Sequence, residues 1–397
     1  MTKRSDVGVV CRRTWLAAVM MLVCFAGTLR AQAQTRFTVM NLDDSGPGSL
    51  RDAIEQSARD PFTHTTIDFA PELQGVIPLE STLNLCRALS VSIEGPGAGR
   101  IALNGQNRVK IFTACNLREG EPGQDINVPI SGLTLENGVG ESGGGIGTAA
   151  KMTVRDITFL ENEASTEGGA IDNVAGTLNV INCTFSGNRA GRKGGALYTN
   201  NGTVQITNST FSGNSAPKGG AIYNFSYRFT VVNSTIAGNT ASQSGGGILH
   251  APHERHRAEV KGTILAENEG GNCVAEDFSG ERITSLGYNL STDDTCPFRN
   301  SGDRNGIPAD LDPNGLGAHG GSTPTIALLA TSAAVDAIPA DQCTGIDGNL
   351  LRSDQRGAPR PEGKGCEIGA YELSSTLPFA SFQVSQGQTG PPYYYQP

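Results

Sequence analysis

The sequence is short of charged residues and of long apolar runs. Only 17% of its 397 residues are charged, and the formal net charge is −9 at pH 7. This acidic balance argues against a nucleic-acid partner, because phosphate binding requires clustered Lys and Arg side chains. No apolar run follows the one at residues 15–29, so we expect no transmembrane span in the mature chain.

Familiar catalytic signatures are missing as well. The sequence has no phosphate-binding loop, no Ser-His-Asp or Cys-His arrangement, and neither the Asn-Thr-Asp nor the Gly-His-Gly signature of polygalacturonases. The run at 253–257, His-Glu-Arg-His-Arg, could bind a transition metal together with His250, but its spacing favours a charged loop. Residues 310–315 imitate the start of a calcium loop, although Gly321 stands where a glutamate is required. We therefore expect no cofactor and no metal, with calcium at residues 310–315 as the alternative.

The first 33 residues have the pattern of a targeting segment. Four basic residues between positions 3 and 13 precede the apolar run, and the Ala-Gln-Ala sequence at 31–33 offers a cleavage site. The adjacent arginines Arg12 and Arg13 leave twin-arginine export open beside ordinary secretion. We expect an exported protein that is secreted or associated with the cell surface or outer membrane.

Seven of the nine cysteines lie beyond the targeting segment. Disulfides form in exported proteins, but their connectivity cannot be deduced from sequence alone. Proximity in the sequence suggests three pairs, which are Cys86–Cys115, Cys273–Cys296 and Cys343–Cys366. Cys183 occupies a repeat position that other repeats fill with Ile, Ser or Thr, so we expect a buried, unpaired thiol there.

Glycine is abundant, and the glycines recur in a fixed phrase. Two glycines, a small residue and an aliphatic residue occur five times, and the aliphatic residue steps by 25 or 26 positions. The five phrases occupy residues 143–146, 168–171, 194–197, 219–222 and 245–248. A second phrase ends in phase with them at Asn137, Asn162, Asn188, Asn214, Asn239 and Asn268. Such self-similarity indicates stacked repeats.

Each repeat alternates apolar and polar residues over short runs that Asn and Gly interrupt, which is typical of short strands joined by tight turns. One repeat buries too little surface to fold by itself, so the repeats should stack as coils whose parallel strands lie about 4.8 Å apart. We therefore predict an all-β parallel β-helix solenoid of roughly nine or ten coils. Phe159, Phe185 and Phe211 share one position of the repeat and should stack in its interior.

The alternating GGAI and FxxN phrases of residues 130–270 resemble the repeats of the bacterial polymorphic outer-membrane proteins. That resemblance implies a right-handed parallel β-helix of the pectin-lyase-like kind. Residues 44–54 resemble the N-terminal module of secreted bacterial β-helix proteins, in which a GSLREAI-like helix caps the first coil. Residues 286–290, 320–325 and 354–357 resemble the choice-of-anchor module, which implies a cap at the C-terminal end.

These patterns divide the chain into five segments. They are a signal peptide at 1–33, an N-terminal cap with the first coils at 34–105, the β-helix repeats at 106–300, a choice-of-anchor-type cap at 301–373 and a disordered tail at 374–397. We expect the exported chain to be a monomer.

The residues that follow the inward aliphatic positions should point outward, and Asp172, Tyr198 and Tyr223 are among them. The two tyrosines predict an aromatic platform on which a sugar can stack beside a carboxylate. The alternative is simple stabilisation of the strand ladder. Glu136 and Glu161 are expected to be equivalent in adjacent coils, about 5 Å apart. They are either paired carboxylates for glycoside hydrolysis or solvated turn residues.

The leading hypothesis is a non-catalytic secreted or cell-surface scaffold, adhesin-like, that binds an extracellular glycan or a cell-surface component. The alternative is a polysaccharide lyase or glycoside hydrolase of pectin-lyase-like fold, acting beside Tyr198 and Tyr223. Hydrolysis and elimination both require acidic and basic residues gathered at one place. Because the sequence lacks such a cluster, the scaffold hypothesis is favoured.

Overall fold

The computed structural model describes residues 35–59, 63–87, 90–115, 127–251, 256–276 and 283–374. The expected signal peptide lies outside these ranges. So do residues 375–397 of the expected tail and residues 253–255 of the His-Glu-Arg-His-Arg run. The regular elements of the described chain are strands, apart from one short α-helix and one 3-10 helix.

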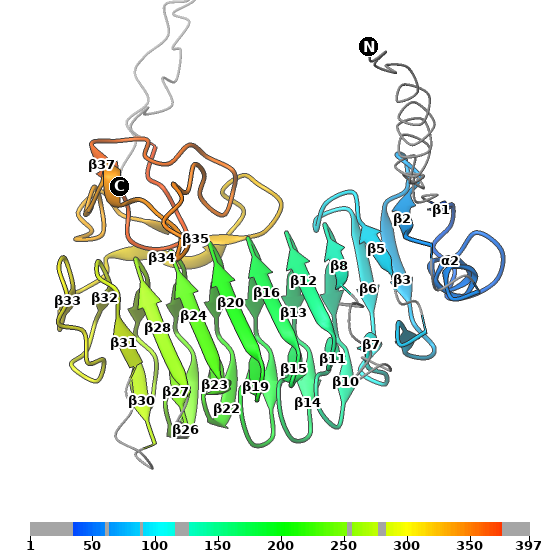
Figure 1. The fold of residues 1–397 in the computed structure, drawn as a ribbon, viewed down its shortest axis with the longest axis horizontal. Helices are drawn as coiled ribbons and strands as arrows, with labels where there is room; N and C mark the ends of the chain where they lie inside the picture. Colours follow the sequence, from blue (N-terminus) through cyan, green and yellow to red (C-terminus); the bar gives the residue numbers. More distant parts are fainter. Residues whose placement is uncertain are drawn as a thin grey trace, which may run out of the picture.

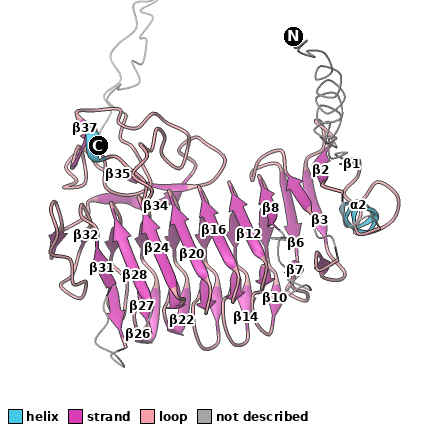
Figure 2. Ribbon diagram, viewed as in Figure 1, coloured by secondary structure: helices cyan, strands magenta, loops and turns pink. Residues whose placement is uncertain are grey.

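The strands form a parallel solenoid (Figures 1 and 2), which confirms the predicted fold class and is consistent with a right-handed β-helix. A complete coil passes through four sheets in turn, as β12, β13, β14 and β15 do. The first sheet contains β1 (Thr35–Val39), β2 (Thr65–Phe69), β5 (Val91–Glu94), β8 (Asn127–Ser131), β12 (Lys151–Arg155), β16 (Thr177–Ile181), β20 (Thr203–Thr207), β24 (Arg228–Val232), β28 (Arg257–Lys261) and β31 (Ile283–Ser285). The second contains β3 (Gly75–Pro78), β6 (Ile101–Asn104), β9 (Thr134–Glu136), β13 (Thr158–Leu160), β17 (Thr184–Ser186), β21 (Thr210–Ser212), β25 (Thr235–Ala237), β29 (Ile264–Ala266), β32 (Leu290–Ser291) and β33 (Arg304–Asn305).

The other two sheets carry the side of the solenoid where the candidate residues lie. The third sheet contains β10 (Val139–Gly140), β14 (Glu163–Ala164), β18 (Arg189–Ala190), β22 (Ser215–Lys218) and β26 (Thr240–Ser244). The fourth contains β4 (Leu83–Asn84), β7 (Phe112–Ala114), β11 (Ile146–Thr148), β15 (Ile171–Val174), β19 (Leu197–Asn200), β23 (Ile222–Phe225), β27 (Ile248–His250) and β30 (Cys273–Ala275). The two-glycine phrases form the corner between these two sheets.

The predicted phenylalanine column is confirmed. Phe159, Phe185 and Phe211 stand in register on β13, β17 and β21, and all three side chains are fully buried. Their rings stack with centroids 4.6 Å and 4.3 Å apart. The coil spacing brings equivalent side chains to stacking distance, so a residue type repeated at one position packs against itself.

Five asparagines form a hydrogen-bonded ladder along one turn of the solenoid. They are Asn162, Asn188, Asn214, Asn239 and Asn268, and all five are buried. At each step, the side-chain oxygen of one asparagine accepts hydrogen bonds from the backbone N–H and the side-chain amide of the previous one, at 2.8–3.0 Å. The ladder therefore satisfies backbone groups that the turn would otherwise bury without partners.

The strand register corrects two expectations about this turn. Asn137 does not join the ladder, because it shares a left-handed turn position with Glu161, with φ of 52° and 51°. Gly138 takes the ladder position instead, and its N–H donates to Oδ1 of Asn162 at 2.9 Å. The same register sets Glu136 one residue out of phase with Glu161. The predicted equivalence of the two glutamates is therefore wrong, and they do not form a pair of stacked carboxylates.

The cysteines pair as proximity in the sequence suggested. Disulfides join Cys86 to Cys115, Cys273 to Cys296 and Cys343 to Cys366. Cys183 is a free, fully buried thiol, and its N–H donates to Oγ of Ser209 at 3.1 Å within the predicted column of small residues. Burial raises the pKa of this thiol to about 12, so it is protonated and unreactive at neutral pH.

The helix α2 (Leu50–Ser57) lies at the N-terminal end of the solenoid, beside β1 (Figure 1). Ser49 caps it, because the Ser49 side chain accepts a hydrogen bond from the N–H of Asp52 at 3.2 Å. Leu50, Ala53 and Ile54 are buried in the main core together with the first strands. The amphipathic face of the helix therefore packs onto the first coils.

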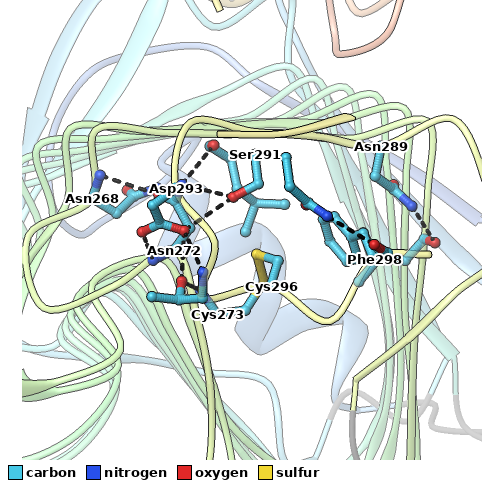
Figure 3. Close-up of a disulfide and its surroundings, with 12 residues drawn as sticks. Asn268, Asn272, Cys273, Asn289, Ser291, Asp293, Cys296 and Phe298 are labelled. Carbon is cyan, nitrogen blue, oxygen red and sulfur yellow. Dashed lines mark hydrogen bonds between the residues drawn. A yellow bond between two sulfur atoms is a disulfide. The ribbon is translucent and has the colours of Figure 1, made fainter. Parts of the chain in front are cut away.

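Near the other end of the solenoid, the disulfide between Cys273 and Cys296 joins β30 to the segment that follows β32 (Figure 3). Cys296 and Phe298 are buried in the main core. Asn272 accepts a hydrogen bond from the last rung of the asparagine ladder at 2.8 Å, and its own N–H donates to Oδ2 of Asp293 at 3.0 Å. The ladder thus ends on a carboxylate of the last, incomplete coil, just after β32.

The segment expected to cap the C-terminal end, at 301–373, lies elsewhere. Residues 306–374, which follow β33, run along the flank of the later coils (Figure 1). Gln355 donates to Oγ1 of Thr184 at 2.8 Å and accepts from Oγ1 of Thr210 at 2.7 Å, and the N–H of Ala370 donates to Oγ1 of Thr235 at 3.1 Å. The three threonines are the first residues of β17, β21 and β25, so the segment bridges successive coils.

Apolar side chains explain why this segment docks on the flank. Ile264 and Leu290 of the second sheet pack in a separate buried cluster with Ile338 and Ile368 of the segment. Without the segment, Ile264 and Leu290 would form an apolar strip exposed to water, and burying that strip favours docking. The segment has its own antiparallel pairs, β34 (Leu311–Gly317) with β35 (Thr325–Leu328) and β36 (Ile338–Pro339) with β37 (Gly365–Cys366), and the 3-10 helix η1 (Ala340–Gln342).

Candidate functional site

The outer face of the fourth sheet brings the three predicted site residues together. Asp172, Tyr198 and Tyr223 occupy equivalent positions on β15, β19 and β23, in register from coil to coil. The corner before each of these strands fixes where the face begins. Gly194 has a left-handed φ of 65°, and a Cβ added to Gly195 would lie 2.1 Å from a backbone oxygen of the next coil. Only glycine fits this corner, which is why the phrase recurs.

Tyr223 is not the open aromatic surface that the sequence predicted. Its ring stacks on that of Tyr198 at 5.5 Å, but the side chain is only 5% exposed. It packs in a small outer cluster with Leu249, and Nζ of Lys193 lies 4.7 Å from the ring centroid. Burial raises the pKa of the Tyr223 phenol, and the nearby charge of Glu276 adds to the rise. The two rings pair as predicted, but Tyr223 is covered, and the half-buried Tyr198 offers the aromatic surface.

Asp172 is a partly buried carboxylate beside Tyr198. Burial raises its pKa to about 6, against the opposing effects of a hydrogen bond from Ser142 and the charge of Lys110. Its Oδ1 is buried and has no hydrogen-bond partner among the described residues. A carboxylate in this state exchanges its proton close to neutral pH, unlike an ordinary surface aspartate.

Lys110 is a site residue that the sequence did not reveal. Its ammonium lies over Gly147, which is the register partner of Asp172, and a Cβ at Gly147 would be 2.8 Å from Nζ. A Cβ at Gly140 would be 2.9 Å from Cε of the same lysine. Burial lowers the pKa of Lys110, while the charges of Asp172 and Glu141 oppose that shift. Gly140 and Gly147 occupy positions where the next coil carries Ala164 and Asp172. The missing side chains at these two positions were the sign in the sequence that another group fills the space.

The residues that the sequence offered as metal ligands do not belong to the group formed by Asp172, Tyr198 and Lys110. His250 is fully buried, its Nδ1 accepts a hydrogen bond from Nδ2 of Asn224 at 2.8 Å, and its pKa is lowered by burial to about 4. The ring of His256 contacts Phe225 and Tyr227 edge-on, and His253 lies outside the described residues. In the calcium-like run at 310–315, Oδ1 of Asp312 accepts hydrogen bonds from Asn314. No group of three or more His, Cys, Asp or Glu side chains converges within the described ranges.

Stacked parallel coils with glycine corners and an asparagine ladder define the chain as a parallel β-solenoid repeat protein. Residues 156–174, 182–200 and 208–224 match the model of the Chlamydia polymorphic membrane protein repeat. The protein is thus a parallel β-helix protein with repeats similar to those of the polymorphic membrane proteins. The three matched repeats contain Asp172, Tyr198 and Tyr223 in turn.

Two further observations bear on the class of protein. A comparison with curated protein sequences gives no match. In the part of the chain that the structure describes, no helix has the length and apolar character needed to cross a membrane.

Proposed function

We propose that this protein is a non-catalytic, secreted or cell-surface scaffold, adhesin-like, whose fourth sheet binds a glycan on a neighbouring surface. The observation that carries the proposal is the half-buried Tyr198 ring with the Asp172 carboxylate beside it, one coil away on a rigid ladder. The match to repeats of a membrane-protein family supports a place at the cell surface. The three disulfides support export. The protein is proposed to act as a monomer.

The chemistry of the face suits a sugar. An aromatic ring offers apolar area for the C–H face of a pyranose, and Tyr198 gives that area from a stiff strand, at little cost in conformational entropy. The ionised Asp172 accepts hydrogen bonds from sugar hydroxyls, and Lys110 donates them. These groups are held in place by the core beneath them, so binding requires little rearrangement.

Replacing Tyr198 with alanine tests this proposal on a panel of immobilised polysaccharides. Loss of the ring should cost about 1 kcal/mol, or about fivefold in Kd, because one stacking contact is removed. The matched control is Tyr227→Ala, since Tyr227 is 53% exposed in the turn between β23 and β24 and should leave binding unchanged. Equal binding by wild type and Tyr198→Ala, or an equal loss in both variants, would count against this face.

A polysaccharide lyase or glycoside hydrolase is the second candidate, and one observation favours it. Lys110 and Asp172 set a cation and a proton-exchanging carboxylate side by side, and both groups are of the types that abstract or donate protons in glycan cleavage. Purified protein would be incubated with the same polysaccharides and assayed for reducing ends and for 4,5-unsaturated products. Cleavage that disappears in Asp172→Asn would establish an enzyme. If no product forms, the scaffold proposal stands.

A further inference from the structure

A basic hollow lies at the corner between the third and fourth sheets, next to the proposed binding face. Its volume is about 310 Å³. It is lined by Gly191, Arg192, Lys193, Pro217, Lys218 and Gln243. Three of these six residues are cations and none is acidic, although the whole chain has a formal net charge of −9. The hollow therefore concentrates positive charge on an acidic protein.

Lys193 connects the hollow to the binding face. It lines the hollow and also lies with its ammonium 4.7 Å from the ring centroid of Tyr223, which stacks on Tyr198. Lys193 and Lys218 pair in parallel across adjacent coils, so their backbones are about 4.8 Å apart. A chain-like ligand that stacks on Tyr198 and runs along the solenoid axis would pass this corner.

The positive charge of the hollow is only partly neutralised. Arg192 lies 3.7 Å from Glu167, but its side chain is 65% exposed, and such a pair is weak in water. Lys218 forms a closer ion pair with Glu276, at 2.5 Å. Among the described residues, no carboxylate forms an ion pair with Lys193. Lys193 as a residue is partly buried, and a charge in such a place is screened less than one in open water.

We propose that the hollow formed by Arg192, Lys193 and Lys218 binds a carboxylate or sulfate group of an acidic glycan. This inference rests on the proposed function, because it names the class of glycan that the Tyr198 face takes. Asp172 lies one coil before Tyr198 and repels an anion there, whereas the carboxylates nearest the hollow, Glu167 and Glu276, are paired with Arg192 and Lys218. The acidic group of the glycan is thereby directed toward the lysine side of Tyr198, which fixes the orientation of the ligand.

The experiment measures binding of the full chain to three polymers, namely polygalacturonate, dextran sulfate and unmodified dextran. The first two separate a carboxylate from a sulfate ligand, and the third is neutral. The test variant is Arg192→Gln with Lys193→Gln. The control is Arg228→Gln with Arg257→Gln, which removes two exposed cations that are register partners on the first sheet. Circular dichroism melting confirms that both variants are folded.

The wild type should bind at least one acidic polymer and prefer it to dextran, with binding that weakens as salt is raised. The test variant should bind that polymer about tenfold more weakly, while the control variant keeps the wild-type affinity. An equal loss of affinity in both variants would mean that the net charge of the protein, and not the hollow, governs binding, and it would overturn the inference. Preference for dextran, lost in Tyr198→Ala but kept in the test variant, would overturn it while leaving the proposed function intact. If none of the polymers of a wider panel binds, both proposals fail.

Discussion

Replacing Phe185 with alanine should lower the free energy of unfolding by about 3–5 kcal/mol. Phe185 is the middle ring of the interior column, fully buried between Phe159 and Phe211 at centroid distances of 4.6 Å and 4.3 Å. Its loss leaves a cavity that stacked parallel coils cannot close, because the backbone ladder fixes their spacing. Urea unfolding followed by circular dichroism measures the change.

The control for this substitution is Ser186→Ala, one residue further along β17. Ser186 is partly exposed and faces away from the core, so its replacement should change stability by less than about 0.5 kcal/mol. If Phe185→Ala were no more destabilising than Ser186→Ala, the column would not carry the packing that the account assigns to it.

Replacing Arg360 with methionine should cost a comparable 3–5 kcal/mol in the segment that docks on the flank. Arg360 and Glu372 are fully buried, with Nε and Oε1 2.9 Å apart, although the N–H is not aimed along a hydrogen bond. Asp354 is also buried, and Arg356 lies against it at 2.8 Å. Burial and the nearby Glu372 raise the pKa of Glu367, which favours its neutral form. Two arginines therefore balance two carboxylates, and removing one leaves a buried negative charge.

The loss should be largest at the docked edge, because Nη2 of Arg360 donates to the carbonyl of Gly369 at 2.9 Å and Gly369 in turn donates to Gly262 of the coils. Limited proteolysis should therefore cut within residues 306–374 of Arg360→Met sooner than in wild type. Arg352→Met is the matched control, since Arg352 is exposed in the same segment. Identical cleavage rates in all three proteins would show that the buried cluster does not hold the segment in place.

The coils could be predicted from the sequence because a parallel solenoid places equivalent residues beside one another. The Phe159–Phe185–Phe211 column and the small-residue column of Cys183 followed from counting positions within the repeat. The same counting failed at Asn137, where the asparagine precedes the ladder position by one residue and only the strand register reveals it. Where the conspicuous residue of a repeat is shifted by one position, matching residue types alone gives the wrong alignment.

The candidate site was predicted only in part, since its environment depends on side chains from outside its own column. Asp172 and Tyr198 lie where the repeat put them, but the covering of Tyr223 depends on the reach of Lys193 and on an apolar neighbour two coils from Tyr198. Lys110 enters over two glycines from a coil that lacks the repeat phrase. The docking of residues 306–374 on the flank depends on a match of surfaces, which periodicity does not encode.

Hydrogen–deuterium exchange of the full chain, with and without the polysaccharide that binds best in the panel, shows whether the outer face of the fourth sheet around Tyr198 is the binding surface. Added ligand should slow exchange of the backbone amides in β15, β19 and the corner at residues 191–194, and leave the first sheet unchanged. Slowed exchange confined to the first sheet or to residues 306–374 would contradict the account.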